Sequence, residues 1–287
     1  MDEQPARFGP AGNSVSFYAQ GYKSTAQAPA WLAERGLSAF EYSLGRGVTL
    51  KEESATAIGV AMREHGITPS IHAPYFINFA TDDPERQDKN TGWLRQSAEA
   101  ARWMGATRVV FHPGSALKGQ RERAMELSLG NMAQTLQILG DEGLLAGVTL
   151  CPETMGKRNQ LGSLDEVLAF CQAFPQLLPC IDFGHLHTVG VGALNTLEDA
   201  RAIVSAIETT LGLERCRNFH VHFSQIAFSA GGEVRHHNFG EGHGPEFDIV
   251  AKAVAERGFA PTFICESAGN QAEDVAEMKR IWEQVAK

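Results

Sequence analysis

Apolar runs that stop at a histidine or an acidic residue recur along this chain. The clearest is Leu177 to Ile181, which runs straight into Asp182-Phe183-Gly184-His185. A short apolar run with an abrupt polar end is typical of a buried parallel strand at its carboxyl end. Five other runs end in the same way, at His72, His112, Glu153, His222 and Glu266. Six strands that end in metal-binding residue types predict a polynuclear metal site at one end of a barrel.

The order of predicted strands and helices indicates the fold class. Strand and helix patterns alternate about every 30 to 40 residues, which is the spacing of βα units. Ser163 to Glu166 has the form of a capping box and predicts a helix start there. Residues 224–246, rich in glycine and histidine, are expected to form a long loop. The eight predicted strands cover residues 6–8, 39–42, 69–72, 109–112, 148–153, 177–181, 218–223 and 262–266.

Eight alternating units predict an α/β fold, a (β/α)8 barrel formed by residues 1–287 as one domain. The active site of such a barrel lies at the carboxyl ends of its strands. An open doubly wound sheet is the alternative, but no glycine-rich phosphate-binding motif supports it.

Composition narrows the class of protein further. No apolar run approaches the roughly 20 residues that span a bilayer, and the acidic N-terminus does not resemble a signal peptide. The five cysteines include no CxxC pair, so we expect reduced core residues in a cytoplasmic protein. A formal net charge of -9 argues against broad non-specific nucleic-acid binding. Divalent ions would nevertheless reverse the field at one face.

Histidine and carboxylate side chains dominate the predicted site. Imidazoles and carboxylates without thiolates suit zinc, manganese or iron. Two ions about 3.5–4 Å apart need a bridging carboxylate and a shared hydroxide, and they can act on both the attacking and the leaving oxygen of a phosphodiester. The candidate ligands are His72, His112, Glu153, Asp182, His185, His222, His236 and Glu266.

The motifs from His72 to Glu266 resemble the endonuclease IV type of apurinic/apyrimidinic endonuclease, a three-zinc TIM barrel. The resemblance rests on the order of the motifs along the chain. They are His72-Ala73-Pro74-Tyr75-Phe76-Ile77-Asn78, Phe111-His112-Pro113-Gly114-Ser115, Glu153, Asp182-Phe183-Gly184-His185, His222, Arg235-His236-His237-Asn238-Phe239-Gly240-Glu241-Gly242 and Glu266.

The resemblance implies a metal-dependent phosphodiesterase that hydrolyses the DNA backbone 5′ to abasic sites, with two or three zinc ions. In the implied arrangement Glu153 bridges two metals, and Glu153 and Glu266 carry the catalytic role. Tyr75 and Phe76 lie where the family inserts side chains into DNA, and Arg235 is assigned to the substrate. The implied ligand groups are His72, His112 and Glu153; Glu153, Asp182, His222 and Glu266; and His185 with His236.

One departure from the family pattern concerns the third group. The family has an aspartate two residues before the histidine of its last loop, where this chain has Val234. We therefore expect a weak third metal site, held by His185 and His236 alone unless Glu233 or water completes it. His220 points to the same side as His222 but lies deeper, so a role in the barrel core is expected.

A sugar isomerase or epimerase is the alternative function, because related barrels bind one metal and move protons on a sugar. Such an enzyme needs about four ligands, so the additional His72, His112 and His185 favour a multinuclear centre. A non-catalytic binding module would not need so complete a ligand set. The expected partner is damaged DNA or a small sugar phosphate, with no membrane and no obligate protein partner.

Overall fold

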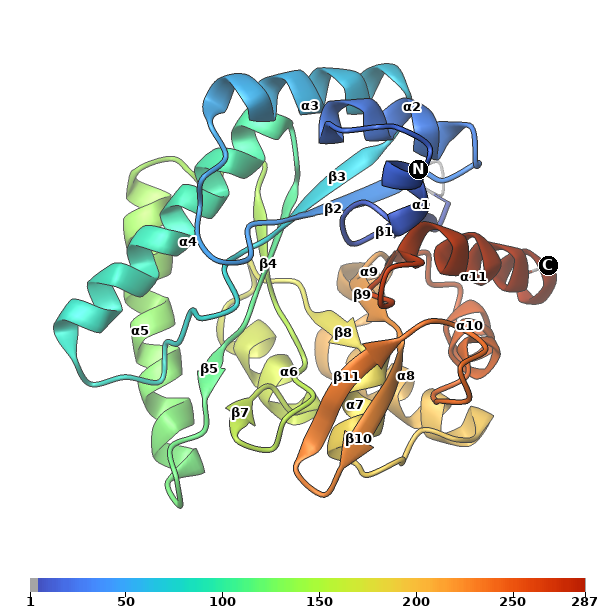
Figure 1. Cartoon of the computed structure of the whole chain (residues 1–287). Helices are drawn as coiled ribbons and strands as arrows, with labels where there is room; N and C mark the ends of the chain where they lie inside the picture. Colours follow the sequence, from blue (N-terminus) through green and yellow to red (C-terminus); the bar gives the residue numbers. More distant parts are fainter. Residues whose placement is uncertain (1–4, 287) are drawn as a thin grey trace.

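Eight parallel strands form the centre of the molecule in a computed structural model that describes residues 5–286. Residues 1–4 of the acidic N-terminus, and residue 287, lie outside the described part. Figure 1 shows the strands surrounded by helices. The barrel strands are β1 (Arg7–Pro10), β2 (Ala39–Ser43), β3 (Thr68–His72), β4 (Arg108–Phe111), β6 (Thr149–Pro152), β8 (Cys180–Asp182), β9 (His220–Phe223) and β12 (Thr262–Cys265).

Two four-stranded sheets make up the barrel, in the orders β1-β12-β9-β8 and β2-β3-β4-β6. Two single parallel bridges join them, Ala11 with Glu41 and Glu153 with Cys180. The predicted (β/α)8 fold is therefore confirmed, and the doubly wound alternative is wrong. The two buried glutamates at these bridges also belong to the site described below.

Helices cover the outside of the barrel and follow the strands in turn. Ser163 and Glu166 form the predicted capping box at the start of α6, and Thr196 with Asp199 forms another before α8. In Figure 1, α4 packs beside α5, and α10 packs beside α11. The outer helices are α2 (Ala28–Ala33), α3 (Glu52–Glu64), α4 (Pro84–Met104), α5 (Arg121–Asp141), α6 (Leu164–Ala173), α8 (Leu197–Leu211), α10 (Phe247–Ala255) and α11 (Gln271–Val285).

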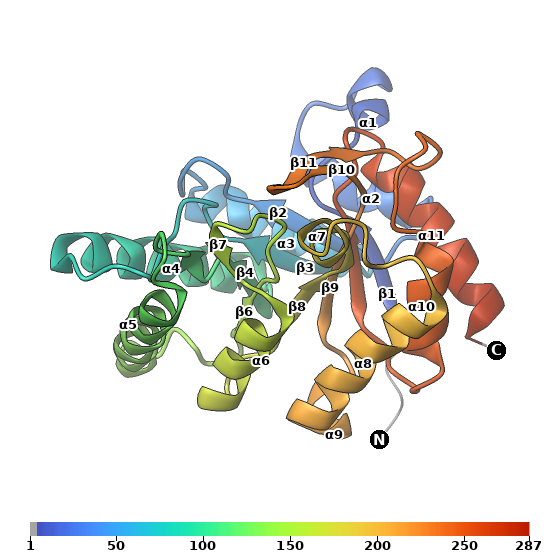
Figure 2. The same cartoon turned by 90° about the horizontal axis from the view of Figure 1, so that it is seen from below.

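Small elements decorate the carboxyl ends of the strands. The prediction of a plain loop over residues 224–246 is wrong, because β10 (Gln225–Ser229) and β11 (Gly232–His237) form an antiparallel hairpin. Gly232, with a φ of 102°, supplies the positive φ at the hairpin turn. Figure 2 places this hairpin and α1 at the same end of the barrel. The other short elements at this end are α1 (Val15–Ala19), the 3-10 helix η1 (Thr25–Gln27), β5 (Gly114–Ser115), β7 (Gln160–Leu161) and α7 (Phe183–Val189). The short helix α9 (Leu213–Cys216) precedes β9 and lies at the opposite end of the barrel (Figure 2).

The hydrophobic core fills the space between strands and helices. Phe8, Phe40, Phe111 and Phe263 are among its buried side chains, and all five cysteines are buried and free. Within residues 5–286, no helix is both long enough and apolar enough to cross a membrane. Close packing of the core holds the strands rigidly. The polar residues at the carboxyl ends of the strands are therefore held in fixed positions as well.

Candidate metal centre

The predicted ligand residues gather at the carboxyl ends of the strands. A cavity of about 340 Å³ opens there, and its lining includes His72, His112, Glu153, His185 and Glu266. His72 and His112 stand at the ends of β3 and β4, and Glu153 follows β6 directly. Side chains far apart in the sequence meet because parallel strands bring their carboxyl ends to one face of a barrel.

Glu153 contacts two groups of histidines with its two oxygens. Its Oε2 lies 3.1 Å from Nε2 of His72 and 3.2 Å from Nε2 of His112. Its Oε1 lies 3.1 Å from Nδ1 of His222 and 3.5 Å from Nδ1 of His185. A carboxylate that presents one oxygen to each of two ligand groups has the geometry of a metal bridge.

A second group joins Glu153 to three residues from other strands. Ligand atoms of Glu153, Asp182, His222 and Glu266 all lie within 4.8 Å of one another. Nδ1 of His222 is 3.5 Å from Oε1 of Glu266. The buried Oδ2 of Asp182 has no hydrogen-bond partner among the described residues. This oxygen also lies 3.4 Å from Nδ1 of His185. A buried carboxylate oxygen that lacks a hydrogen bond and faces other ligand atoms fits a cation site.

The third group contains Glu233, the carboxylate that the sequence left open as a partner of His185 and His236. Oε2 of Glu233 lies 3.6 Å from Nε2 of His185, and Oε1 lies 3.6 Å from Nε2 of His236. Ala227 pairs with Arg235 whereas Phe228 pairs with Glu233, so Val234 is the extra residue of a β-bulge. The bulge turns Glu233 to the same face as His236.

Of the alternatives that the sequence left open at Val234, the structure favours Glu233, which lies beside His185 and His236. The side chain of Val234 is 58% exposed, and it points away from the cluster. Strict strand alternation would put Glu233 and His236 on opposite faces, and one inserted residue reverses that parity. Glu233 and His236 are three residues apart in the sequence. This spacing places two side chains on the same face of a strand only if a β-bulge lies between them.

Four of the histidines are oriented by backbone carbonyls. Because a carbonyl can only accept, Nδ1–H of each ring must be the donor, and Nε2 is left without a proton in the neutral ring. The Nδ1 donors are those of His72 to Ala73 O at 2.8 Å, His112 to Tyr75 O at 2.9 Å, His185 to Thr154 O at 2.8 Å and His236 to Glu266 O at 2.9 Å.

This arrangement fits the divalent metals that the resemblance implies. In all four rings Nε2 faces a carboxylate oxygen at 3.1 to 3.6 Å. Two ligand atoms about 2.1 Å from one tetrahedral ion lie about 3.4 Å apart. Anchored histidines whose second nitrogen faces carboxylates are typical of metal sites.

The pKa values of the ligand side chains show how protons on the histidines balance the charge of the neighbouring carboxylates. Burial acts to lower the pKa of His72, but its hydrogen bond to Glu153 and the surrounding carboxylates raise it to about 9. His236 behaves in the same way beside Glu233, and its pKa also reaches about 9. The close approach of His236 lowers the pKa of Glu233 to about 2. Burial raises the pKa of Asp182, whose carboxylate neighbours add to the effect.

Glu41 on β2 also belongs to the site, although the ends of the apolar runs do not point to it. It is fully buried and contacts Ser70, His220 and His222. The signal was a glutamate inside the apolar run Ala39-Phe40-Glu41-Tyr42. His220 occupies the core position that its strand parity predicted, and burial lowers its pKa to about 4 despite the contact with Glu41.

The three predicted substrate-binding residues differ in position. Tyr75 lines the cavity and is 58% exposed. Phe76 packs edge-on against Trp93, with ring centroids 4.5 Å apart, so its ring contributes to packing at the rim of the barrel. Nε of Arg235 lies 3.0 Å from Nε2 of His237 rather than in the cavity. Tyr75 alone of the three is placed to meet a ligand beside the metal centre.

Comparison with known proteins shows which family this chain resembles in sequence. The sequence model of the xylose isomerase-like TIM barrel family matches residues 29–285. An uncharacterized protein of Methanocaldococcus jannaschii is 33% identical over 250 residues, 86% of this chain and 88% of its own length. A probable endonuclease 4 of Acholeplasma laidlawii is 30% identical over 219 residues, 74% of this chain and 70% of its own.

Solved structures share the fold. A D-tagatose 3-epimerase-like protein superposes with a TM-score of 0.73 at 18% identity, over 98% of both chains. Endonuclease IV from Thermus thermophilus superposes with a TM-score of 0.65 at 23% identity, over 97% of this chain and 98% of its own.

The family match and the barrel together define the class: this chain belongs to the xylose isomerase-like TIM barrel family. Within it, the chain is a divergent member of the endonuclease IV group, as the motifs indicated.

The bulge predicts which side chain controls the third group. Replacement Glu233→Gln should remove one Zn²⁺ per chain, because the amide oxygen carries no charge between His185 and His236. Val234→Asp is the matched control, and it should leave the metal count unchanged because position 234 faces solvent. Metal analysis after dialysis measures both. A rise in bound metal in Val234→Asp would contradict the bulge-based assignment.

The raised histidine pKa values predict that metal binding releases protons. Near pH 7, His72 and His236 are protonated in the metal-free protein, since their pKa values are about 9. They must lose these protons to bind Zn²⁺, so the affinity should rise with pH until about 9 and then level off. Titration calorimetry at pH 7 in buffers of different ionisation enthalpy measures the release. Equal heats in all buffers would exclude it.

Proposed function

We propose that this protein is a metal-dependent phosphodiesterase that cleaves the DNA backbone 5′ to abasic sites, in the cytoplasm. The observation that carries the proposal is the joining of three ligand groups around Glu153. His72, His112, His185, Glu233 and His236 exceed what a single metal requires. A centre of two or three ions suits phosphodiester hydrolysis, in which both the attacking and the leaving oxygen need stabilisation.

Each group of side chains has a definable task in this reaction. Bound divalent ions, zinc first and manganese or iron as alternatives, would supply an activated water and positive charge for the phosphate. Glu153 holds the two halves of the ligand set at a fixed separation through its two oxygens. Glu266 reaches the cavity with an 18% exposed side chain, so it can contact both His222 and a substrate.

A basic groove next to the cavity favours an extended polyanion as the substrate. The metal cavity shares Lys157 with a second cavity, which shares Arg158 with a third that Lys118 also lines. All three side chains are exposed. Arg121 also lines the groove, but its guanidinium is paired with Glu166 at 2.6 Å. A line of exposed cations on a chain of net charge -9 suits phosphates that lead away from the reaction centre.

A sugar epimerase remains the second candidate, because the fold superposes well on a D-tagatose 3-epimerase-like protein. The group of Glu153, Asp182, His222 and Glu266 could by itself hold one metal for such a reaction. An epimerase would leave His112 and Glu233 without a task. The basic groove would also exceed what a monosaccharide can fill.

Incision of a duplex with one abasic-site analogue tests the function directly. The Zn²⁺-loaded protein should cut 5′ to the lesion and leave the intact duplex whole. Glu153→Gln should lower the rate by about 100-fold or more, since even outer partners of metal ligands cost 10–100-fold. Full activity in this variant would remove Glu153 from the mechanism. Epimerisation of a free ketose, without any incision of DNA, would support the sugar epimerase function instead.

Charge reversal tests the groove. The triple variant Lys118→Glu, Lys157→Glu and Arg158→Glu should weaken DNA binding and reduce the slope of log affinity against log salt by about one per side chain. In the double variant Lys118→Glu and Arg158→Glu, hydrolysis of a small phosphodiester should change little, because neither residue lines the metal cavity. The control reverses Arg63 and Lys252, which are exposed on the outer helices α3 and α10. An equal loss of DNA binding in the control would indicate general charge repulsion instead of a groove.

A further inference from the structure

His222 is the one candidate ligand histidine of five that turns its other ring nitrogen toward a carboxylate instead of a backbone carbonyl. Its Nδ1 faces Glu153 and Glu266, and its Nε2 lies 2.8 Å from Oε1 of Glu41. Neither of these last two atoms has a hydrogen bond of regular geometry to any described residue, and each is the close polar neighbour of the other. Both side chains are fully buried, so water cannot take the place of either. Each is therefore the available partner of the other.

The second oxygen of Glu41 is held by two donors. Oγ of Ser70 donates to Oε2 at 2.7 Å. Nε2 of His220 lies 2.9 Å from the same oxygen. With Oε2 engaged twice, Oε1 is the oxygen free to receive His222. The carboxylate cannot rotate toward another partner without breaking both of these contacts.

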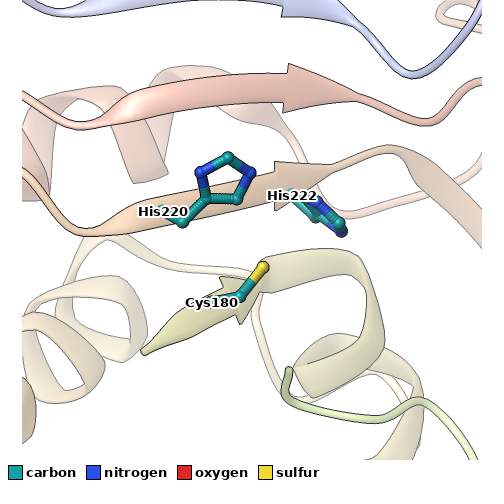
Figure 3. Close-up of side chains that lie close together, drawn as sticks. All are labelled: Cys180, His220 and His222. Carbon is teal, nitrogen blue, oxygen red and sulfur yellow. The ribbon is translucent and has the colours of Figure 1, made fainter. Parts of the chain in front are cut away.

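Arg108 determines which ring nitrogen of His220 carries the proton, and therefore which nitrogen donates to Glu41. Its Nη1 lies 3.4 Å from Nδ1 of His220. A guanidinium has no lone pair to offer, so Nδ1 of His220 must accept. The proton of the neutral His220 ring is then on Nε2, where it is donated to Glu41. Figure 3 shows His220 and His222 side by side on β9, with Cys180 on the neighbouring strand β8.

We propose that Glu41 is a positioning residue that holds His222 as a ligand through Nδ1, at the end of a buried chain from Arg108 through His220. An ionised Glu41 can only accept, so it retains the proton of His222 on Nε2 and leaves the Nδ1 lone pair directed at Glu153 and Glu266. The other four ligand histidines keep their proton on Nδ1 and offer Nε2. The inference rests on the metal centre proposed above.

The tautomers provide a test that needs no variant. In the Zn²⁺-loaded protein labelled with ¹⁵N-histidine, long-range proton–nitrogen correlation spectra should show one metal-bound histidine protonated on Nε2. Four others should be protonated on Nδ1. Five metal-bound histidines with the same pattern would overturn the proposal, because Glu41 would then have no role at His222.

Metal affinity tests the energetic role of Glu41. Glu41→Gln should lower the affinity for Zn²⁺ about 10–100-fold in chelator competition, the usual cost of losing the partner of a metal-bound histidine. It should also perturb the single Nε2-protonated signal and leave the other four in place. Ser70→Ala is the matched control, since it removes one donor to Oε2 but keeps the contact with His222, and its affinity should stay within about threefold.

The contrary outcomes are distinct from failure of the proposed function. Unchanged affinity and spectra in a folded Glu41→Gln protein would overturn the role of Glu41, whether or not the wild type cuts DNA. An additional Zn²⁺ in the wild type that is lost in Cys180→Ser would also overturn it, because Cys180, His220 and His222 would then hold a metal themselves. Weakened Zn²⁺ binding with no DNA incision would support Glu41 and reject the nuclease function alone.

Discussion

The carboxylate of Glu153 is the contact on which the arrangement of the site depends. Its backbone forms the bridge to Cys180, one of the two bridges that join the four-stranded sheets. Its side chain touches histidines from all three ligand groups. Burying such a charge is costly unless it is paired, and the pairing comes from cations or protonated histidines. The closure of the barrel and the assembly of the centre therefore require the same residue to be correctly placed.

The sequence was sufficient for the barrel and for most of the candidate ligands. Strand parity and the abrupt polar ends of apolar runs are local properties, so His72, His112, Glu153 and Asp182 could be found one strand at a time. The capping box at Ser163 was readable for the same reason. Each of these features depends on residues within a few positions of one another.

The features that escaped prediction depend on tertiary context. Glu41 lies in the middle of an apolar strand, and its role becomes visible only when β2 is placed across the barrel from β9. The glycines and histidines of residues 224–246 predict a loop, and they obscure the alternation of the hairpin β10–β11. Glu233 was among the alternatives for the third group, and choosing it required the register of both strands, which no single-strand pattern contains.

The bulge at Val234 separates the spacing of residues in the chain from their spacing in space. Without Val234 the chain would read Glu-Arg-His, an acid two residues before the histidine, which is the spacing of the family motif. The extra residue is absorbed as a local twist of β11, and the carboxylate and the imidazole stay on one face. A hairpin built in this way can gain or lose a residue while its functional side chains keep their positions. Motif matching by fixed spacing would then reject proteins whose chemistry is intact.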